Sequence, residues 1–544
     1  MMLAPLRDNP RRQAVVRSAT VPAPVEGWDA STALAAMKPL RAVQLKNWFP
    51  QPGYLEVRRG FDQHATGMGA STSIESLMAW NGPSTSKMFA AAGSVIYDVT
   101  SSGMASSSAT GLTNARWQHV NFTTSAGAFL FCVNGADAPR YYDGSSWTTP
   151  TITGTGYTST STIHLNVHKK RLWLIQANST KAYYLGTEAV AGTATGFELG
   201  SNFTLGGYLM AMATWSIDAG SGPDDYACFI SSKGQIAVYG GTDPASALTW
   251  ELLGTYNGAP PIGRRCFVQY GSSPLLITTS GVLQLGLTLK TDQAQLTASA
   301  LSARILQAIN AAARNYSSNF GWEACVYPHG TRLIINIPTD ENTSAAQYVM
   351  NTLTGAWCEF DSHNANCWIV YGNNLYFGAN DGRVYHADTG SADYATPITA
   401  VGQTAYQALF AAGNIKRFTM VEPLVTAEGT ARPSVGISTD FNETAVLSTP
   451  SSAAAAASSL WDVAVWDTDV WGGSSTTVVS DWTSTPALGR FASVKFQATT
   501  GSDVNIGVWG TSKWGFGKWG RSGGAAQTMQ INGFIVLAEV GGPL

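Results

Sequence analysis

Residues 129–144 read FLFCVNGADAPRYYDG, and residues 226–240 read YACFISSKGQIAVYG. In each stretch an apolar run meets a turn that contains glycine, and a second run with tyrosine or valine on one face follows. Alternation over about four to eight residues predicts β-strands, and a short glycine-containing break between two such runs predicts a hairpin.

The same pattern recurs through the middle of the chain. Further copies span residues 87–99, 170–185, 274–286, 332–357 and 374–388. The residues that mark the turns are Gly93, Gly135, Asn178, Gly234, Gly281 and Gly382. A single hairpin cannot bury both of its faces, whereas a ring of hairpins stacked face to face can. Because hairpins that recur every ~40–50 residues are typical of propeller blades, the sequence predicts a β-propeller of six to eight blades over residues 51–394.

The composition supports an all-β fold. Charged residues make up only 12% of the 544 residues, and 56 residues are glycine, which suits short strands and tight turns better than long solvated helices. One strong helical pattern interrupts the repeats near residues 297–316, where Leu301, Ile305 and Ile309 recur four apart. The sequence therefore predicts one short helical insertion in a β protein.

The two ends of the chain differ from the repeats. Residues 1–50 carry several prolines and predict an irregular attachment arm with a short helix at residues 29–39, capped by Asp29 and stopped by Pro39. Residues 395–544 contain strand-like runs and a linker that reads SSAAAAASS. We expect a second β domain there, a sandwich or a barrel, that serves as a platform.

Charge and cysteine usage restrict the partners. The formal net charge of −3 argues against tight binding to nucleic acid through phosphate neutralisation. We find neither a secretory signal nor an apolar stretch long enough to span a bilayer. The six cysteines are scattered and lie in apolar runs, so we expect small buried side chains in a protein made in a reducing cytoplasm. No cofactor or metal is expected.

Tryptophan recurs every five residues in two stretches near the C-terminus. These residues are Trp461, Trp466, Trp471, Trp509, Trp514 and Trp519. A spacing of five fits neither a helix face nor a strand face, so each indole is expected to enter a shared cluster from a short loop. We interpret the cluster as a stacking core or subunit contact; a glycan-binding platform is the alternative.

Several catalytic patterns match only formally. Residues 515–520 fit GxGxxG without a preceding strand, and residues 520–524 fit GxSxG with no histidine after the serine. His164 and His168 lie four apart in a β-rich stretch and are expected on one strand face as ordinary histidines. The sequence therefore predicts a protein that is not an enzyme. A propeller glycosidase using Asp218 or Asp224 is the minor alternative.

Segments spread over most of the chain resemble one protein family. They are residues 25–61, 116–122 (RWQHVNF), 206–244, 260–267 (PPIGRRCF), 317–328 (SSNFGWEACVYP), 348–360, 415–420 and 466–473 (WDTDVWGG). In order and spacing these segments are similar to tail nozzle proteins of short-tailed bacteriophages, also described as tail tubular or packaged-DNA stabilisation proteins.

The resemblance implies a structural protein of the virion tail that is assembled in the host cytoplasm. It implies a ring of self-associated subunits, six in number, below a head-to-tail adaptor protein and in contact with tail fibre or needle proteins. Genomic double-stranded DNA would pass through the lumen without tight binding, and six copies at −3 each would form a mildly acidic tube. A receptor- or glycan-binding tail protein is the alternative.

Two further expectations concern residues in this family context. We expect Arg7, Arg11, Arg12 and Arg17 of the N-terminal arm to reach the adaptor. We interpret Gly263-Arg264-Arg265-Cys266 as a structural or inter-subunit motif, since the family has no catalytic residues to transfer.

Overall fold

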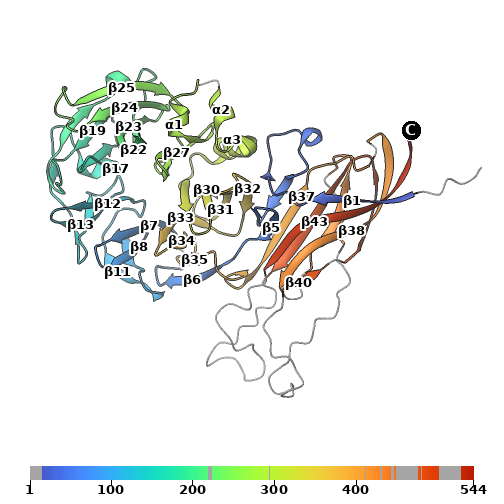
Figure 1. Ribbon diagram of the computed structural model, residues 1–544. Helices are drawn as coiled ribbons and strands as arrows, with labels where there is room; N and C mark the ends of the chain where they lie inside the picture. Colours follow the sequence, from blue (N-terminus) through green and yellow to red (C-terminus); the bar gives the residue numbers. More distant parts are fainter. Residues whose placement is uncertain are drawn as a thin grey trace, which may run out of the picture. The chain divides into compact units, whose positions relative to one another are not determined.

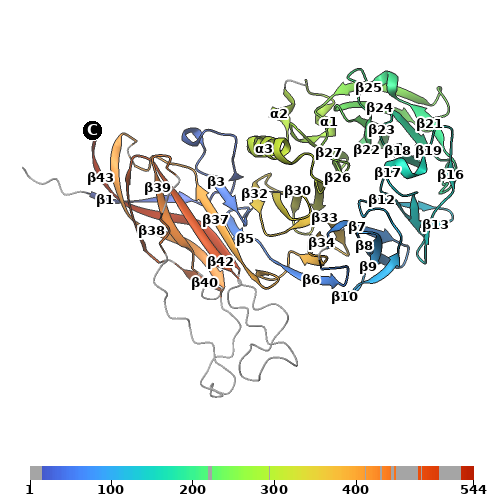
Figure 2. The same ribbon diagram turned by 180° about the vertical axis from the view of Figure 1, so that it is seen from behind.

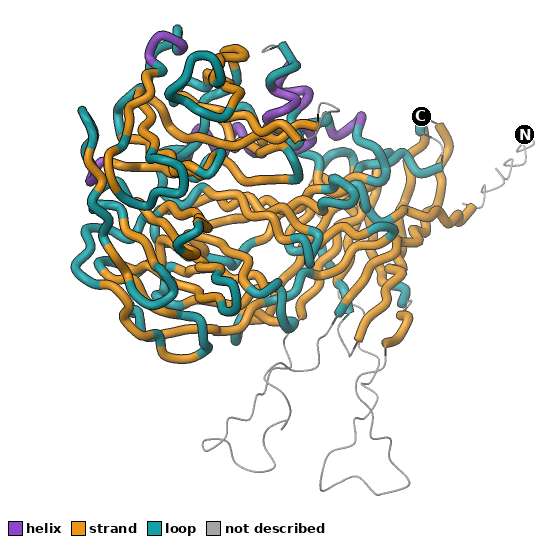
Figure 3. The backbone as a smooth tube through the Cα atoms, turned by 60° about the vertical axis from the view of Figure 1, so that its left-hand side comes forward, coloured by secondary structure: helices purple, strands orange, loops and turns teal. Residues whose placement is uncertain are grey.

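The computed structural model describes residues 15–70, 72–218, 223–292, 295–410, 412–428, 432–442, 446–448, 476–479, 481–500 and 528–543 (Figure 1). Strands dominate these residues, and the helices are few and short (Figure 3). The predicted all-β class is therefore confirmed. The chain divides into two compact units, one of residues 59–396 and one that joins residues 1–58 to residues 397–544. No helix among the described residues is long and apolar enough to cross a membrane.

The larger unit contains, within its described residues, seven antiparallel arrays of three or four strands, which we call the first to seventh sheets; the sixth and seventh are parts of a longer strand path. The first sheet is formed by β7 (Ile74–Asn81), β8 (Ser86–Ala92), β9 (Val95–Asp98) and β11 (Ser106–Ala109). The second is formed by β12 (Gln118–Thr124), β13 (Gly127–Val133), β14 (Arg140–Tyr142) and β15 (Trp147–Thr148). The third is formed by β17 (Thr162–His168), β18 (Arg171–Gln176), β19 (Lys181–Tyr184) and β21 (Thr195–Glu198).

The remaining sheets follow in chain order. The fourth to seventh sheets are formed by β22 (Leu209–Asp218), β23 (Pro223–Ser231), β24 (Gln235–Gly241) and β25 (Trp250–Asn257); by β26 (Phe267–Tyr270), β27 (Ser273–Thr278) and β28 (Gly281–Gln284); by β29 (Glu323–Tyr327), β30 (Arg332–Asp340), β31 (Ser344–Asn351) and β32 (Trp357–Phe360); and by β33 (Ala365–Tyr371), β34 (Asn374–Ala379), β35 (Val384–Ala387) and β6 (Phe61–Thr66).

The first four sheets each bury both faces against two neighbours, as strand β8 illustrates. Met88 and Ala90 belong to an apolar cluster shared with the seventh sheet, whereas Phe89 and Ala91 belong to one shared with the second sheet. Alternate side chains of a strand point to opposite faces, so a nearly continuous apolar run is what a strand buried on both sides requires. Similar clusters join the second sheet to the third, the third to the fourth and the fourth to the fifth.

The sheets follow one another around a common centre (Figures 1 and 2). The first strands of successive sheets lie side by side, from β7 through β12, β17 and β22, and from β26 through β29 and β33 back to β7. The seventh sheet combines strands from the two ends of the unit, because β35 pairs antiparallel with β6. The circle is thus closed by hydrogen bonds between residues more than 300 positions apart.

The predicted turn residues have the expected backbone geometry. Gly93, Gly135, Asn178, Gly234, Gly281 and Gly382 all have positive φ angles, between 54° and 116°. Glycine and asparagine adopt this left-handed region at the lowest cost, which explains why they mark the turns. In the sixth sheet, where the sequence showed only a long copy, Asn342 takes the same role with φ 60° between β30 and β31.

The predicted helical insertion is present, in a broken form. It consists of α2 (Leu296–Ser299), a 3₁₀ turn (Ala303–Ile305) and α3 (Leu306–Tyr316). Ile305 and Ile309 are buried, and α3 packs on β28 and β30.

The second unit consists of two sheets. One contains β1 (Val15–Pro22), β4 (Trp48–Gln51), β5 (Tyr54–Val57), β38 (Asn414–Glu428), β40 (Thr476–Val479), β41 (Thr483–Gly489) and β43 (Met529–Pro543). The other contains β2 (Gly27–Trp28), β3 (Arg41–Lys46), β37 (Thr396–Thr404), β39 (Ser434–Thr439) and β42 (Ala492–Thr500). The two sheets face each other. The ring centre of Phe496 in β42 lies 5.4 Å from that of Trp48 in β4 and 5.1 Å from that of Phe534 in β43.

The N-terminal residues differ from the expected arm. From residue 15 onward they form strands, and β1 pairs with β43 along its whole length. The expected helix at residues 29–39 is reduced to one 3₁₀ turn, Leu34–Ala36. Its intended cap, Asp29, instead accepts the amide hydrogens of Ser31 and Thr32 and forms an ion pair of 2.7 Å with Arg41. These contacts fix a local turn rather than the start of a helix.

Candidate functional site

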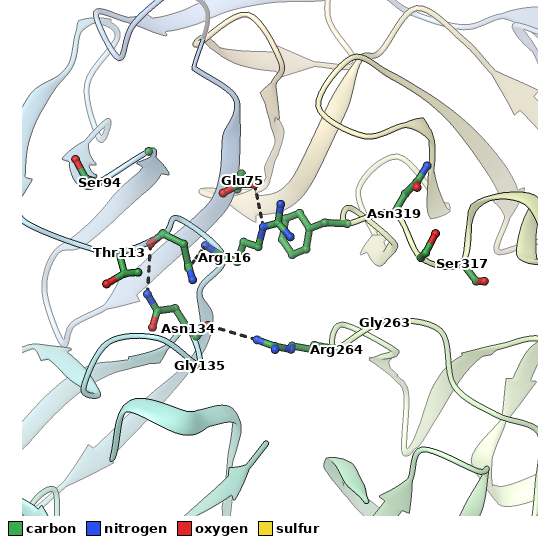
Figure 4. A pocket seen from close by; sticks show the side chains of 14 residues that line it. Glu75, Ser94, Thr113, Arg116, Asn134, Gly135, Gly263, Arg264, Ser317 and Asn319 are labelled. Carbon is green, nitrogen blue, oxygen red and sulfur yellow. Dashed lines mark hydrogen bonds and ion pairs between the residues drawn. The ribbon is translucent and has the colours of Figure 1, made fainter. Parts of the chain in front are cut away.

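A cavity of about 690 Å³ lies at one end of the sheets of the larger unit (Figure 4). Hairpin turns of the first and second sheets and the loops that lead into β12, β26 and β29 form its wall. The lining side chains are mostly polar and include Glu75, Ser94, Thr113, Arg116, Asn134, Arg264, Ser317, Asn319 and Phe320. Three arginines lie in or next to this wall, and each has a different environment.

Arg265 is a structural cross-link. Its Nη2 donates to Ser76 Oγ at 2.6 Å and to the carbonyl oxygens of Glu75 and Trp117 at 2.9 and 3.1 Å. Its Nη1 lies 3.3 Å from the carboxylate of Glu323 in β29. One half-buried guanidinium therefore joins the first strand of the first sheet, the loop before the second sheet and the sixth sheet.

Arg116 is neutralised by two carboxylates. Its Nε lies 3.0 Å from Glu75 and its Nη2 lies 2.7 Å from Glu341. Burial alone would lower the pKa of Arg116, but the two carboxylates outweigh it and raise that pKa above its ordinary value. Its guanidinium also lies 4.4 Å from the centre of the Phe320 ring, and that of Arg265 lies 5.0 Å from the same centre.

Arg264 has no carboxylate partner among the described residues and is exposed to the cavity. Its one hydrogen bond is a long one of 3.4 Å to the carbonyl oxygen of Asn134 (Figure 4). The surrounding protein and the charge of Arg116 lower the pKa of Arg264. The pKa of arginine lies so far above neutrality that the guanidinium stays charged at neutral pH.

The predicted interface residues fall mostly outside the described residues. These are Arg7, Arg11, Arg12, Trp461, Trp466, Trp471, Trp509, Trp514 and Trp519. Arg17 lies in β1, where it is exposed and pairs in register with Ala538 of β43. The roles of these arginines and tryptophans therefore stay predictions.

His164 and His168 lie on the same face of β17, as predicted, and both are buried. His164 packs 5.5 Å from the ring of Phe267, and His168 packs 5.9 Å from that of Trp250. Burial lowers the pKa of both imidazoles to about 4, so they are neutral at physiological pH. Neutral histidines among aromatic rings are part of the core.

The described residues contain no cluster of three or more His, Cys, Asp or Glu side chains that could hold a metal ion. All six cysteines are buried and unpaired, as the sequence predicts. Across β22 and β23, Asp218 pairs in register with Pro223, and Asp224 pairs with Ile217. Asp225 accepts a hydrogen bond of 2.6 Å from Ser216 and pairs with Lys169 at 3.3 Å.

The sequence singled out only part of this site. The Gly263–Cys266 motif was recognised, and its structural interpretation fits Arg265. The roles of Arg116, Phe320 and Glu323 were missed, although all three lie in segments that carry the family resemblance. The available signal was that three segments are specific to the family that the chain resembles: residues 116–122, 260–267 and 317–328. The spacing of these segments in the sequence does not indicate that they meet in the fold.

Comparisons with solved structures give distant likenesses. No family model matches the chain, and no curated protein sequence matches it. The computationally designed Ika8 protein has 13% identity, a TM-score of 0.35, and coverage of 60% of this chain and 100% of its own. BBS1N, solved in complex with ARL6DN, has 11% identity, a TM-score of 0.39, and coverage of 62% and 99%. A quinonprotein alcohol dehydrogenase-like protein from Bacteroides thetaiotaomicron has 12% identity, a TM-score of 0.31, and coverage of 53% and 66%.

Proposed function

We propose that this protein is a structural subunit of a short bacteriophage tail, a nozzle ring that lets the genome out on infection and helps to retain it beforehand. In this proposal the larger unit is a seven-bladed β-propeller whose last blade is completed by β6, and the second unit is the attachment platform. The protein acts by assembly and is not an enzyme.

One observation carries the proposal. Three segments that resemble the nozzle family, and that lie far apart in the sequence, meet around the cavity: Arg116 comes from the first, Arg265 from the second, and Phe320 and Glu323 from the third. The hydrogen bonds and ion pairs of Arg265 and Arg116 connect different sheets to one another. The residues that connect the sheets thus lie in the segments that resemble the nozzle family. This coincidence supports a mechanical role for the circle of sheets.

Particles assembled without this protein test the proposal. They are expected to contain heads whose DNA leaks and becomes sensitive to nuclease, and purified protein added back should restore retention. Antibodies against the protein should label the tail. Particles that lack the protein but still hold their DNA and infect would contradict the proposal.

The N-terminal hypothesis needs a truncation that respects the fold. Deleting residues 1–14 removes Arg7, Arg11 and Arg12 while leaving β1 complete. We expect this variant to fold and to fail to join the adaptor. Normal joining by the truncated protein would remove these arginines from the attachment.

A further inference from the structure

We infer that the cavity around Arg264 binds a small carboxylated sugar of the uronic-acid class, with the guanidinium of Arg264 holding the carboxylate. The nozzle assignment does not require this site, and the site does not require the nozzle assignment. The inference rests on charge, room and hydrogen-bonding groups in the cavity wall.

The charge of Arg264 is available to a ligand. Both carboxylates nearest to Arg116 are paired with Arg116 itself, and Glu323 is paired with Arg265. The carboxylate of Asp137 accepts hydrogen bonds from the amide and the hydroxyl of Thr113 and from the side-chain amide of Asn134. Arg264 is therefore the cation in the described cavity wall whose fork is not already used, and a guanidinium binds a carboxylate with two parallel hydrogen bonds.

Room for the guanidinium depends on a glycine. A Cβ atom placed on Gly135 would lie 2.8 Å from Nη1 of Arg264 and 3.0 Å from a methyl carbon of Ile163. The absence of a side chain at position 135 lets the guanidinium lie against the backbone of Asn134 and Gly135 (Figure 4). This close approach fixes the direction in which the fork points.

The rest of the wall suits hydroxyl groups better than a second charge. Ser94, Ser317 and Ser318 line the cavity, and no described side chain takes up their hydroxyls. The cavity of about 690 Å³ lies in the range of small-molecule sites. One free cation together with several hydroxyl groups favours a ligand with one carboxylate and several hydroxyls over a doubly charged phosphate.

The test is isothermal titration of the full-length protein with D-glucuronate, using D-glucose and acetate as separate arms. We expect saturable glucuronate binding with a dissociation constant on the order of 1 mM, and at least ~tenfold weaker binding of both comparison compounds. Arg264→Met is expected to weaken glucuronate binding at least ~tenfold, while the control Arg383→Met, a change at a partly exposed arginine that lies outside the cavity wall and is paired with Asp381, leaves it unchanged.

A second pair of variants separates position from charge. Gly135→Ala keeps Arg264 but displaces its guanidinium, so binding should weaken with the charge intact. Gly206→Ala introduces similar backbone strain, φ 68° against 73°, with nothing within 4 Å of the new Cβ atom, and should bind normally. Absence of saturable glucuronate binding, equal binding of acetate, or unchanged binding by folded Arg264→Met would each overturn the inference.

Discussion

Two adjacent arginines illustrate how little the residue type alone decides. Arg264 and Arg265 share one motif, yet the first is exposed to a cavity and the second is held by four acceptors. The sequence predicted a structural motif here and could not divide the two roles. The division depends on Ser76, Trp117 and Glu323, which reach Arg265 only when the sheets close into a circle.

The two arginines also make a matched pair of variants. Arg265→Met removes the cation that pairs with the carboxylate of Glu323 and the donor to the carbonyl oxygens of Glu75 and Trp117, so we expect the free energy of unfolding to fall by about 3 kcal/mol. Arg264→Met removes one long, exposed hydrogen bond and should change that energy by less than about 0.5 kcal/mol. Urea denaturation followed by tryptophan fluorescence measures both. Equal effects would show that Arg265 is not a cross-link.

Buried histidines predict an acid-sensitive core. His164 and His168 have pKa values of about 4 in the folded protein and an ordinary value of 6.5 when unfolded. Between these values the unfolded chain binds more protons, so the stabilisation is complete above pH 6.5 and is lost as the pH falls toward 4. Each histidine contributes a slope of up to about 1.4 kcal/mol per pH unit.

Denaturation between pH 6.5 and 5 checks this sign. The double variant His164→Gln, His168→Gln should show a shallower loss of stability with falling pH than the natural protein. His329→Gln, at an exposed histidine, should keep the natural slope. Identical slopes in the double variant and the natural protein would mean that these histidines do not govern acid stability.

At the scale of elements, the local pattern was readable and the long-range pairing was not. The repeated hairpins and their turn residues follow from alternation and from glycine and asparagine at positions of positive φ. By contrast, residues 61–66 and 15–22 pair with strands more than 300 residues away, and short apolar runs carry no record of a distant partner. For this reason the sequence alone predicts a separate arm at residues 1–50, whereas residues 15–22 pair with β43.

The closing strand β6 is the element whose loss should matter most. Ala65 is fully buried in the cluster between the seventh and first sheets, so Ala65→Asp places a charge without a partner at the seam. We expect a loss of at least about 3 kcal/mol of stability and faster amide exchange first in β6 and β35. Gln63→Asp, at an exposed position of the same strand, should exchange normally. Amide exchange in β6 and β35 that is unchanged by Ala65→Asp would contradict the closure of the circle through β6.

Strand β1 offers a second test at this scale. It pairs with β43 over eight residues and buries Val21. Deleting residues 1–22 removes this strand and should lower the melting temperature of the second unit by several degrees, on the order of 4–8 °C. The shorter deletion of residues 1–14 leaves the strand in place and should not. Calorimetry distinguishes the two, and equal melting temperatures would show that β1 adds nothing to this unit.

At the scale of the whole molecule, the circular arrangement of sheets is the feature on which the proposed role in assembly rests. A sheet of three or four short strands is too small to bury its own faces, and in the first four sheets two neighbours cover them. Mutual burial of this kind holds the sheets in place without a ligand, which fits the role proposed above for a tail component.

The most direct test is the mass of the purified protein in solution together with an electron-microscopic image. The account predicts a hollow ring of six chains of 57.5 kDa each, stable on dilution. A protein that remains a single chain at all concentrations, with no ring in the images, would contradict it.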